Sequence, residues 1–210
     1  MSGETPSPPK AEVVPLPQKN AVADPDFRPD VGIFGMTLFL ASLAVLFAAS
    51  IVGYLVVRLK SEQWRPEELE GLPSGLWFAT AVLLGASFCI HSALSSIKAE
   101  NQGTLRQMML ATTLLGTLFL VLQGFNWWGL VRGHDAAHLN NLYAFTFFLL
   151  TGIHALHVIG GVIQLVVVTN KAFTGTYTAD YHPGVTYSAM YWHFLDGVWL
   201  VLFVLLLVLS

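Results

Sequence analysis

The chain has 210 residues, of which 54% are hydrophobic and 11% are charged, and its formal net charge is −3. An average soluble domain carries about 25% charged residues, so this composition excludes an ordinary soluble protein and predicts an all-α integral membrane protein. The small net charge, with no basic patch or nucleic-acid-binding motif, argues against a nucleic-acid partner. The single cysteine, Cys89, excludes an internal disulfide and a multi-cysteine metal site.

Residues 1–30 differ in composition from the rest of the chain. They hold seven of the ten prolines and almost no large apolar side chains. Such a segment cannot bury enough apolar surface to fold, so we predict a disordered N-terminal tail. It lacks the apolar region that a secretory signal peptide contains, and its acidic residues argue against a mitochondrial presequence.

Five apolar runs follow, and each is long enough to cross a bilayer as a helix. Backbone polar groups in lipid need hydrogen-bond partners within the protein, which favours helices over strands. We therefore predict one transmembrane domain over residues 31–210. Its five helices are expected at about 33–57, 74–97, 107–131, 143–168 and 187–209.

Five crossings place the two termini on opposite sides of the membrane. The side that holds the N-terminal tail carries six Lys or Arg residues, and the other side carries four. Because positively charged residues favour the cytoplasmic side, this distribution predicts a cytoplasmic N-terminus and an external C-terminus.

The fourth predicted helix carries two histidines near its centre, His154 and His157. Ionisable groups at membrane depth usually face a bundle interior or a polar cavity, and they usually have a partner. Gly152 and Gly161 flank them, and small residues of this kind allow helices to pack closely. This stretch is therefore a candidate for a polar site inside the bundle.

The fifth predicted helix carries a second polar spot. His193 and Asp196 are three residues apart, so they are neighbours on one helical face and are able to hydrogen-bond. Asp196 is the only carboxylate within the five predicted helices. Trp192 and Trp199 share its stripe, and we expect both to pack in the bundle.

The second predicted helix carries a polar stripe that includes His91. Its polar residues are spaced by seven, four and four positions, which places them on one helical face. We expect this face to meet another helix rather than lipid. The stripe consists of Thr80, Ser87, His91 and Ser95.

The membrane histidines have several interpretations. In the first, they are hydrogen-bonded packing groups. In the second, they line a lipid headgroup site or a polar cavity. In the third, His154 and His157 contribute to a metal or haem site. A metal site needs three or four convergent ligands, and no carboxylate lies near His154 in the sequence. His193 and Asp196 form either one buried polar pair or part of a proton relay, although the first and third helices supply no titratable group to such a relay.

Two motifs carry a resemblance to a known family. The segment Thr151-Gly152-x-His154-x-x-His157-Val158-x-x-Gly161 resembles a signature of cytochrome c oxidase subunit III. The segment Tyr191-Trp192-His193-Phe194-x-Asp196-x-Val198-Trp199 resembles the last helix of the same family. Shorter similarities occur in the same order, at Gly35–Ser42 and at Leu118–Trp127, so the resemblance covers roughly residue 33 to the C-terminus. The chain resembles the five-helix form, which lacks two N-terminal helices.

The resemblance implies a role beside a catalytic partner in a bacterial cytoplasmic membrane. Family members pack on subunit I of a haem-copper oxidase, together with subunit II, and the haem and copper lie in those partners. Subunit III itself carries neither cofactor, holds phospholipid in a cleft, and supports proton uptake and the stability of the catalytic subunit. The resemblance places His91, His154, His157, His193 and Asp196 in the bundle interior or near the lipid cleft.

The chain departs from the family at three positions where a glutamate is usual, which are Leu43, Asn126 and Thr186. The departures leave a related interpretation open, in which the chain is an accessory subunit of a nitric oxide reductase or another respiratory complex. Two further alternatives are a haem-binding electron carrier that pairs His154 or His157 with His91 or His193, and a small transporter or assembly factor. Five helices without an internal repeat argue against a transporter.

Overall fold

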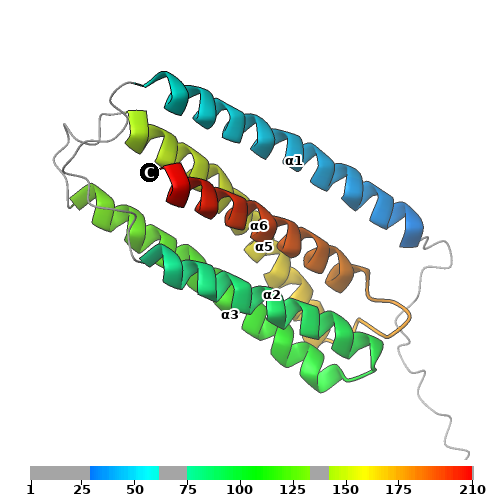
Figure 1. Cartoon of the computed structure of the whole chain (residues 1–210). Coiled ribbons are helices and arrows are strands. Elements are labelled where there is room, and N and C mark those ends of the chain that lie inside the picture. Colours follow the sequence, from blue (N-terminus) through cyan, green and yellow to red (C-terminus); the bar gives the residue numbers. More distant parts are fainter. Residues whose placement is uncertain (1–28, 62–74, 133–141, 210) are drawn as a thin grey trace, which may run out of the picture.

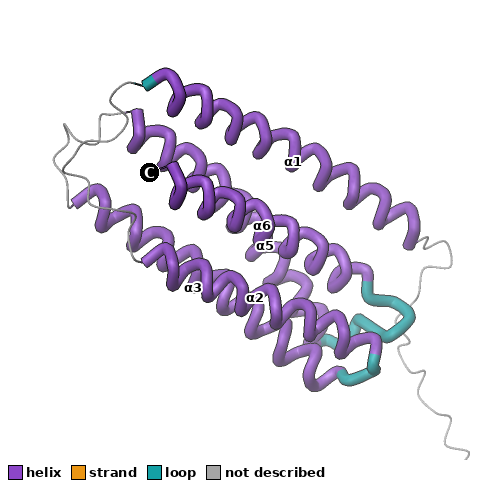
Figure 2. The backbone as a smooth tube through the Cα atoms, viewed as in Figure 1, coloured by secondary structure: helices purple, strands orange, loops and turns teal. Residues whose placement is uncertain are grey.

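The computed structural model describes residues 29–61, 75–132 and 142–209. Within these ranges every regular element is an α-helix (Figure 2). The helices are α1 (Pro29–Lys60), α2 (Gly75–Lys98), α3 (Gln102–Arg132), α5 (Leu142–Phe173) and α6 (Pro183–Leu209). Each is long and apolar enough to cross a membrane, which confirms the predicted all-α fold with five transmembrane helices. The tail predicted for residues 1–30 lies outside the described residues, except for its last two.

Four helices, α1, α3, α5 and α6, extend by three or more residues beyond their predicted ranges, and local features at the helix ends explain the extensions of α3, α5 and α6. The α3 helix begins at Gln102 because the Asn101 side chain accepts a hydrogen bond from the backbone N–H of Thr104, at 3.1 Å. The α6 helix begins at Pro183, since proline fits the first helical position, where its missing N–H costs nothing. The α5 helix continues to Phe173 and ends where Gly175 adopts a φ of 72°.

The α6 helix is central to the arrangement, because it packs against α1, α2 and α5 (Figure 1). The α2 and α3 helices form an antiparallel pair joined by a tight turn, and α3 also packs against α5. Small residues recur on the buried side of α2, where Ala79, Ala86 and Ala93 are all fully buried. Small side chains let helices in a membrane approach closely, which gains van der Waals contact.

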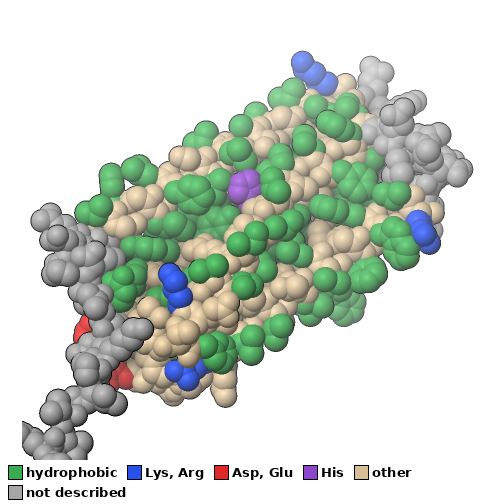
Figure 3. All heavy atoms as spheres, turned by 180° about the vertical axis from the view of Figure 1, so that it is seen from behind, with side chains coloured by type: hydrophobic (Ala, Val, Ile, Leu, Met, Phe, Trp, Pro, Cys, Tyr) green, Lys and Arg blue, Asp and Glu red, His purple; other side chains and the backbone are tan. Residues whose placement is uncertain are grey.

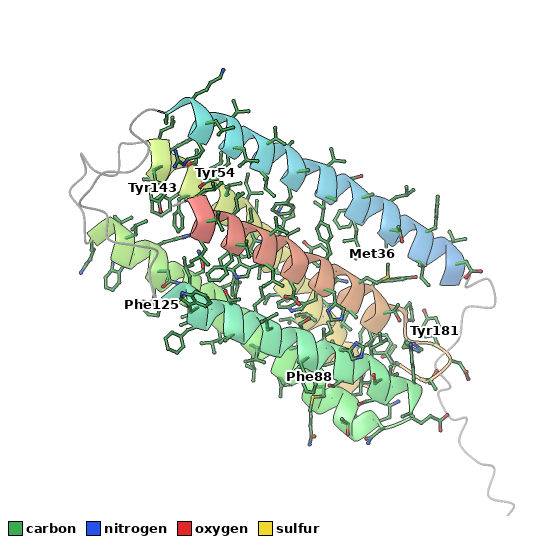
Figure 4. All side chains as sticks on the ribbon, viewed as in Figure 1. Met36, Tyr54, Phe88, Phe125, Tyr143 and Tyr181 are labelled. Carbon is green, nitrogen blue, oxygen red and sulfur yellow. The ribbon has the colours of Figure 1, made fainter. Side chains whose placement is uncertain are left out.

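The α1 helix is more peripheral and packs on α6 and α5 only through one stripe. Phe47 is 2% exposed and anchors the middle of that stripe. Near one end, Tyr54 of α1 lies beside Tyr143 of α5 (Figure 4). At the same end, Arg58 Nε donates to the backbone oxygen of Leu209 at 3.2 Å, which satisfies a carbonyl at the C-terminus of α6.

The outer surface of the bundle is apolar along the length of the helices. Hydrophobic side chains cover the face shown in Figure 3, and the visible Lys and Arg side chains lie toward the ends. Large exposed hydrophobic residues occur on all five helices, as expected for surfaces that meet lipid or other membrane helices. The description of this chain as a multi-pass membrane protein follows from these features together with the helix lengths.

Candidate functional site

His154 lies at the centre of a box of aromatic rings. Its side chain is completely buried. The ring centroid of Trp199 is 5.1 Å away, that of Phe119 is 6.0 Å away, and that of Phe47 is 6.2 Å away. These rings come from α6, α3 and α1, so His154 of α5 joins four helices at one level. The sequence placed His154 inside the bundle, and the structure does so too.

The surroundings of His154 do not fit a haem ligand. Aromatic rings from three other helices surround the imidazole, and its complete burial leaves no open side for a flat macrocycle. Neither ring nitrogen has a hydrogen-bond partner among the described residues. The arrangement is that of a packing group rather than a cofactor ligand.

Trp199 connects the aromatic box to α2. Its indole Nε1 donates to the hydroxyl of Thr80 at 2.9 Å, and both residues are buried. Trp192, seven residues earlier on α6, is 1% exposed and contacts α3 at Gly116. The structure thus buries both tryptophans of the predicted stripe and shows which helix each one joins to α6.

His157 is half-buried and lies at the edge of the aromatic box, beside Phe47 of α1. Its Nδ1 lies 2.8 Å from the backbone oxygen of Ile153, one turn earlier on α5. Phe47 packs against its ring with a centroid distance of 5.1 Å. The backbone oxygen of His157 accepts a hydrogen bond from the hydroxyl of Tyr191, at 2.9 Å. The two histidines of the α5 motif therefore have separate roles, and no feature of the sequence predicted the contact with Tyr191.

The two glycines of this motif also differ. A Cβ built on Gly161 would lie 3.0 Å from Cε1 of Tyr191, so this position allows α6 to approach α5 closely. A Cβ built on Gly152 would meet no atom within 4 Å. Gly161 therefore makes a close contact with α6, and Gly152 makes no such contact with the described residues.

A polar cluster lies between α2 and α6. His193 Nδ1 is 2.8 Å from Ser87 Oγ and 3.9 Å from Oδ2 of Asp196. His193 and Asp196 are therefore close, but Nδ1 of His193 hydrogen-bonds to Ser87 of α2 rather than to the carboxyl group. Neither carboxyl oxygen of Asp196 has a hydrogen-bond partner among the described residues. Asp196 is 5% exposed and is the middle residue of α6.

His91 and His193 do not lie inside the bundle. The imidazole of His193 is 41% exposed, and His91 of α2 is also exposed, with a ring centroid 6.1 Å from that of His193. Of the two locations that the sequence left open for these histidines, the exposure of their rings fits the lipid cleft better than the bundle interior. The polar stripe of α2 faces α6 at Thr80 and Ser87, and it is exposed further along at His91 and Ser95.

The three positions that depart from the family's glutamates lie in different surroundings. Asn126 faces Gly75 at the start of α2, and Thr186 donates to the backbone oxygen of His182 at 3.3 Å. Leu43 packs in the apolar contact between α1 and its neighbours. Gln123, one turn before Asn126, is 1% exposed, and its amide has no protein partner within the described residues.

The geometry indicates what the polar groups are able to do. Among the described residues, no three His, Cys, Asp or Glu side chains are grouped as a metal site requires. The polar groups instead pair across helices, as Ser87 does with His193 and Thr80 does with Trp199. Such pairs specify how helices pack within a membrane. The fold and these contacts define a multi-pass helical membrane protein with a structural polar interior.

Comparison with known proteins identifies the family. The family model described as cytochrome c oxidase subunit III matches residues 29–210. The chain belongs to the cytochrome c oxidase subunit III family, which confirms the resemblance seen in the two helix motifs. Membership places it in a complex with the catalytic subunits of a haem-copper oxidase.

Curated relatives agree with this assignment along most of the chain. Cytochrome c oxidase subunit 3 of Thermostichus vulcanus is 33% identical over 184 residues, covering 87% of this chain and 90% of the relative. The protein of the same name from Synechocystis sp. is 34% identical over 186 residues, covering 87% of this chain and 77% of the relative. The probable cytochrome c oxidase subunit 3 of Nocardia farcinica is 30% identical over 178 residues, covering 84% and 87% respectively.

Proposed function

We propose that this chain is a non-redox subunit that stabilises the catalytic core of a respiratory terminal oxidase. It contacts subunit I and subunit II, which hold the haem and copper and carry out oxygen reduction, and it contains no catalytic residue of its own. The family match over residues 29–210 carries this proposal. The enclosure of His154 by three aromatic rings supports it, because the most buried histidine is committed to packing.

The proposal includes bound phospholipid and a defined orientation. Apolar hollows along the helix surfaces suit acyl chains, and Lys98 and His182 lie beside one such hollow at the end where α6 begins. The excess of Lys and Arg on that side supports a cytoplasmic N-terminus in a bacterial inner membrane. The C-terminus is then external. Phospholipid retained between the helices would stabilise the catalytic subunit, because its acyl chains would fill the hollows at the contact between the two subunits.

Purification from native membranes tests the proposal. A tagged chain, extracted in a mild detergent, is expected to co-purify with oxidase subunits in fixed stoichiometry and with phospholipid. The haem spectrum of the complex should be unchanged by His154→Phe, because the haem belongs to the partners. A Soret band from the purified chain alone that is lost in His154→Phe would contradict the proposal. Co-purification with nitric oxide reductase subunits would assign the chain to the alternative complex.

A further inference from the structure

Three buried polar residues of α6 have side-chain atoms without a protein partner. Ser188, Trp192 and Asp196 are spaced by four positions, so they lie on one face of the helix. None of them is more than 5% exposed. Among the described residues, no hydrogen-bond partner is present for Oγ of Ser188, Nε1 of Trp192 or either carboxyl oxygen of Asp196. We refer to these three residues as the α6 polar row.

The α6 polar row lies inside the bundle and reaches the middle of the membrane. Trp192 packs against Gly116 of α3, on the side of α6 that faces its neighbours. Ser188 is in the second turn of α6, and Asp196 is the middle residue of the helix. The eight positions between Ser188 and Asp196 correspond to about 12 Å along the helix axis. The row therefore leads from near the start of α6 to its centre.

A comparison of Trp192 with Trp199 shows what is unusual about this row. Both indoles belong to the buried side of α6, and each is 1% exposed. Nε1 of Trp199 donates to the hydroxyl of Thr80 at 2.9 Å, whereas Nε1 of Trp192 has no partner among the described residues. Buried polar groups in proteins are nearly always paired, either with the protein or with ordered water. The unpaired atoms of the row therefore point to a bound molecule.

The chemistry of the row selects the class of this molecule. The indole N–H of Trp192 is only a donor, so it directs the positive end of its dipole at the molecule and disfavours a metal cation. The carboxyl group of Asp196 supplies acceptor oxygens and disfavours an anion. The molecule must therefore accept a hydrogen bond from one group and donate to the other. Water does both, and it is the usual partner of such groups inside proteins.

The side chains near the row are small enough to leave room for water. Residues one turn apart have Cβ atoms about 5–6 Å from each other, which is a distance that one bridging water spans. Ala189 lies beside Ser188 on α6, and Ala86 and Ala93 occupy the buried side of α2. These side chains fill less of the space between helices than leucine or phenylalanine would. A buried water needs only about 10–15 Å³ of accessible volume.

We propose that ordered water binds along the α6 polar row, and that one water molecule accepts a hydrogen bond from Nε1 of Trp192 and donates one to a carboxyl oxygen of Asp196. This inference concerns the interior of the chain and does not depend on the proposed function. It accounts for a carboxyl group at the centre of a membrane helix that has no protein partner for either of its oxygens.

Ultraviolet resonance Raman spectroscopy of the purified full-length chain tests the bond to Trp192. One tryptophan band in such spectra falls in frequency when the indole N–H donates a hydrogen bond. Subtracting the spectrum of Trp192→Phe from that of the wild type isolates the band of Trp192. The same subtraction with Trp199→Phe gives a hydrogen-bonded reference, because Thr80 accepts from Trp199. In a Thr80→Val background it gives an unbonded reference.

We expect the band of Trp192 to lie at the frequency of the hydrogen-bonded reference. A band at the frequency of the unbonded reference would overturn the inference, because it would show that the indole N–H meets no acceptor.

A cryo-EM map of the native complex, at a resolution that shows ordered water, identifies the acceptor. We expect density at hydrogen-bonding distances of roughly 2.7–3.2 Å from Nε1 of Trp192 and from one carboxyl oxygen of Asp196. Contacts of about 2.3–2.6 Å would indicate a cation instead and would refute the proposal. Side-chain conformations that pair both groups directly with protein atoms would also refute it.

Two variants at Asp196 test which group holds the water. Asp196→Asn keeps an acceptor oxygen at this position, so the water density should remain. Asp196→Leu removes every acceptor, so the density should be lost. Density that persists in Asp196→Leu would show that the carboxyl group does not bind the water. If Asp196→Leu does not fold, the wild-type map and the Raman comparison still decide the question.

Discussion

At the scale of single residues, Gly116 marks the closest approach of α3 to α6. A Cβ at this position would lie 2.5 Å from Cη2 of Trp192 and 3.2 Å from Cγ2 of Val162. The indole is buried and rigid, so it cannot move aside without shifting α6. Gly116→Ala is expected to destabilise the bundle by about 1–3 kcal/mol.

Thermal unfolding in detergent measures this effect, and Gly124→Ala on the same helix is the control. A Cβ at Gly124 meets no atom within 4 Å, so this substitution should leave the unfolding temperature equal or slightly raised. Equal unfolding temperatures for the two variants would show that Trp192 relaxes more readily than the packing indicates.

The hydrogen bond between Thr80 and Trp199 gives a second prediction at this scale. Thr80→Val keeps the shape of the side chain but removes the acceptor of the 2.9 Å bond, and so leaves a buried indole N–H without its partner. We expect a loss of about 0.6–1.7 kcal/mol, the range found for hydrogen bonds inside membrane proteins. Trp199→Phe in the Thr80→Val background should add less than it does alone, and additive losses in this double-mutant cycle would contradict the coupling.

At the scale of elements, α1 is held mainly by one stripe, and Phe47 is a buried aromatic group near the middle of that stripe. Phe47→Ala removes contacts with His154, His157 and Phe194 at once. We expect amide hydrogen exchange in α1 to become several-fold faster, because the helix separates locally from α5 and α6. Amide hydrogen exchange in α2 and α3 should be unchanged, because the main contacts of α1 are with α5 and α6.

Val45→Ala is the matched control for this element, since Val45 is two residues from Phe47 and 70% exposed. It should not alter exchange in α1. Faster exchange across all five helices in Phe47→Ala would instead mean that α1 unfolds together with the rest of the bundle.

The elements also show what the sequence was able to predict. The number and type of helices follow from apolar length alone, because lipid forces backbone hydrogen bonds within each segment. The burial of His154 follows from its place near the middle of a long apolar run. Which face of α2 is buried was not predictable, because a helix with both an alanine stripe and a polar stripe can bury either one. The difference between Gly152 and Gly161 depends on which side of α5 meets α6, and a single sequence does not specify that contact.

At the scale of the whole molecule, the charge distribution predicts one orientation in the membrane. Counted along the sequence, six Lys and Arg residues are assigned to the side of the N-terminus and four to the other side. The first group includes Lys98 and Lys171 at the ends of α2 and α5, and the second includes Arg58 and Lys60 at the end of α1. Cationic residues resist transfer across the inner membrane, so the more basic side should remain cytoplasmic.

Labelling of single cysteines in intact cells tests this orientation. In a Cys89→Ala background, Ser61→Cys places a thiol just after α1, and Thr174→Cys places one just after α5, at the opposite end of the bundle. A membrane-impermeant maleimide is expected to label Ser61→Cys in whole cells and to label Thr174→Cys only after the cells are opened. The reverse pattern would contradict the charge rule for this chain, and it would place the hollow that Lys98 and His182 line on the external side of the membrane.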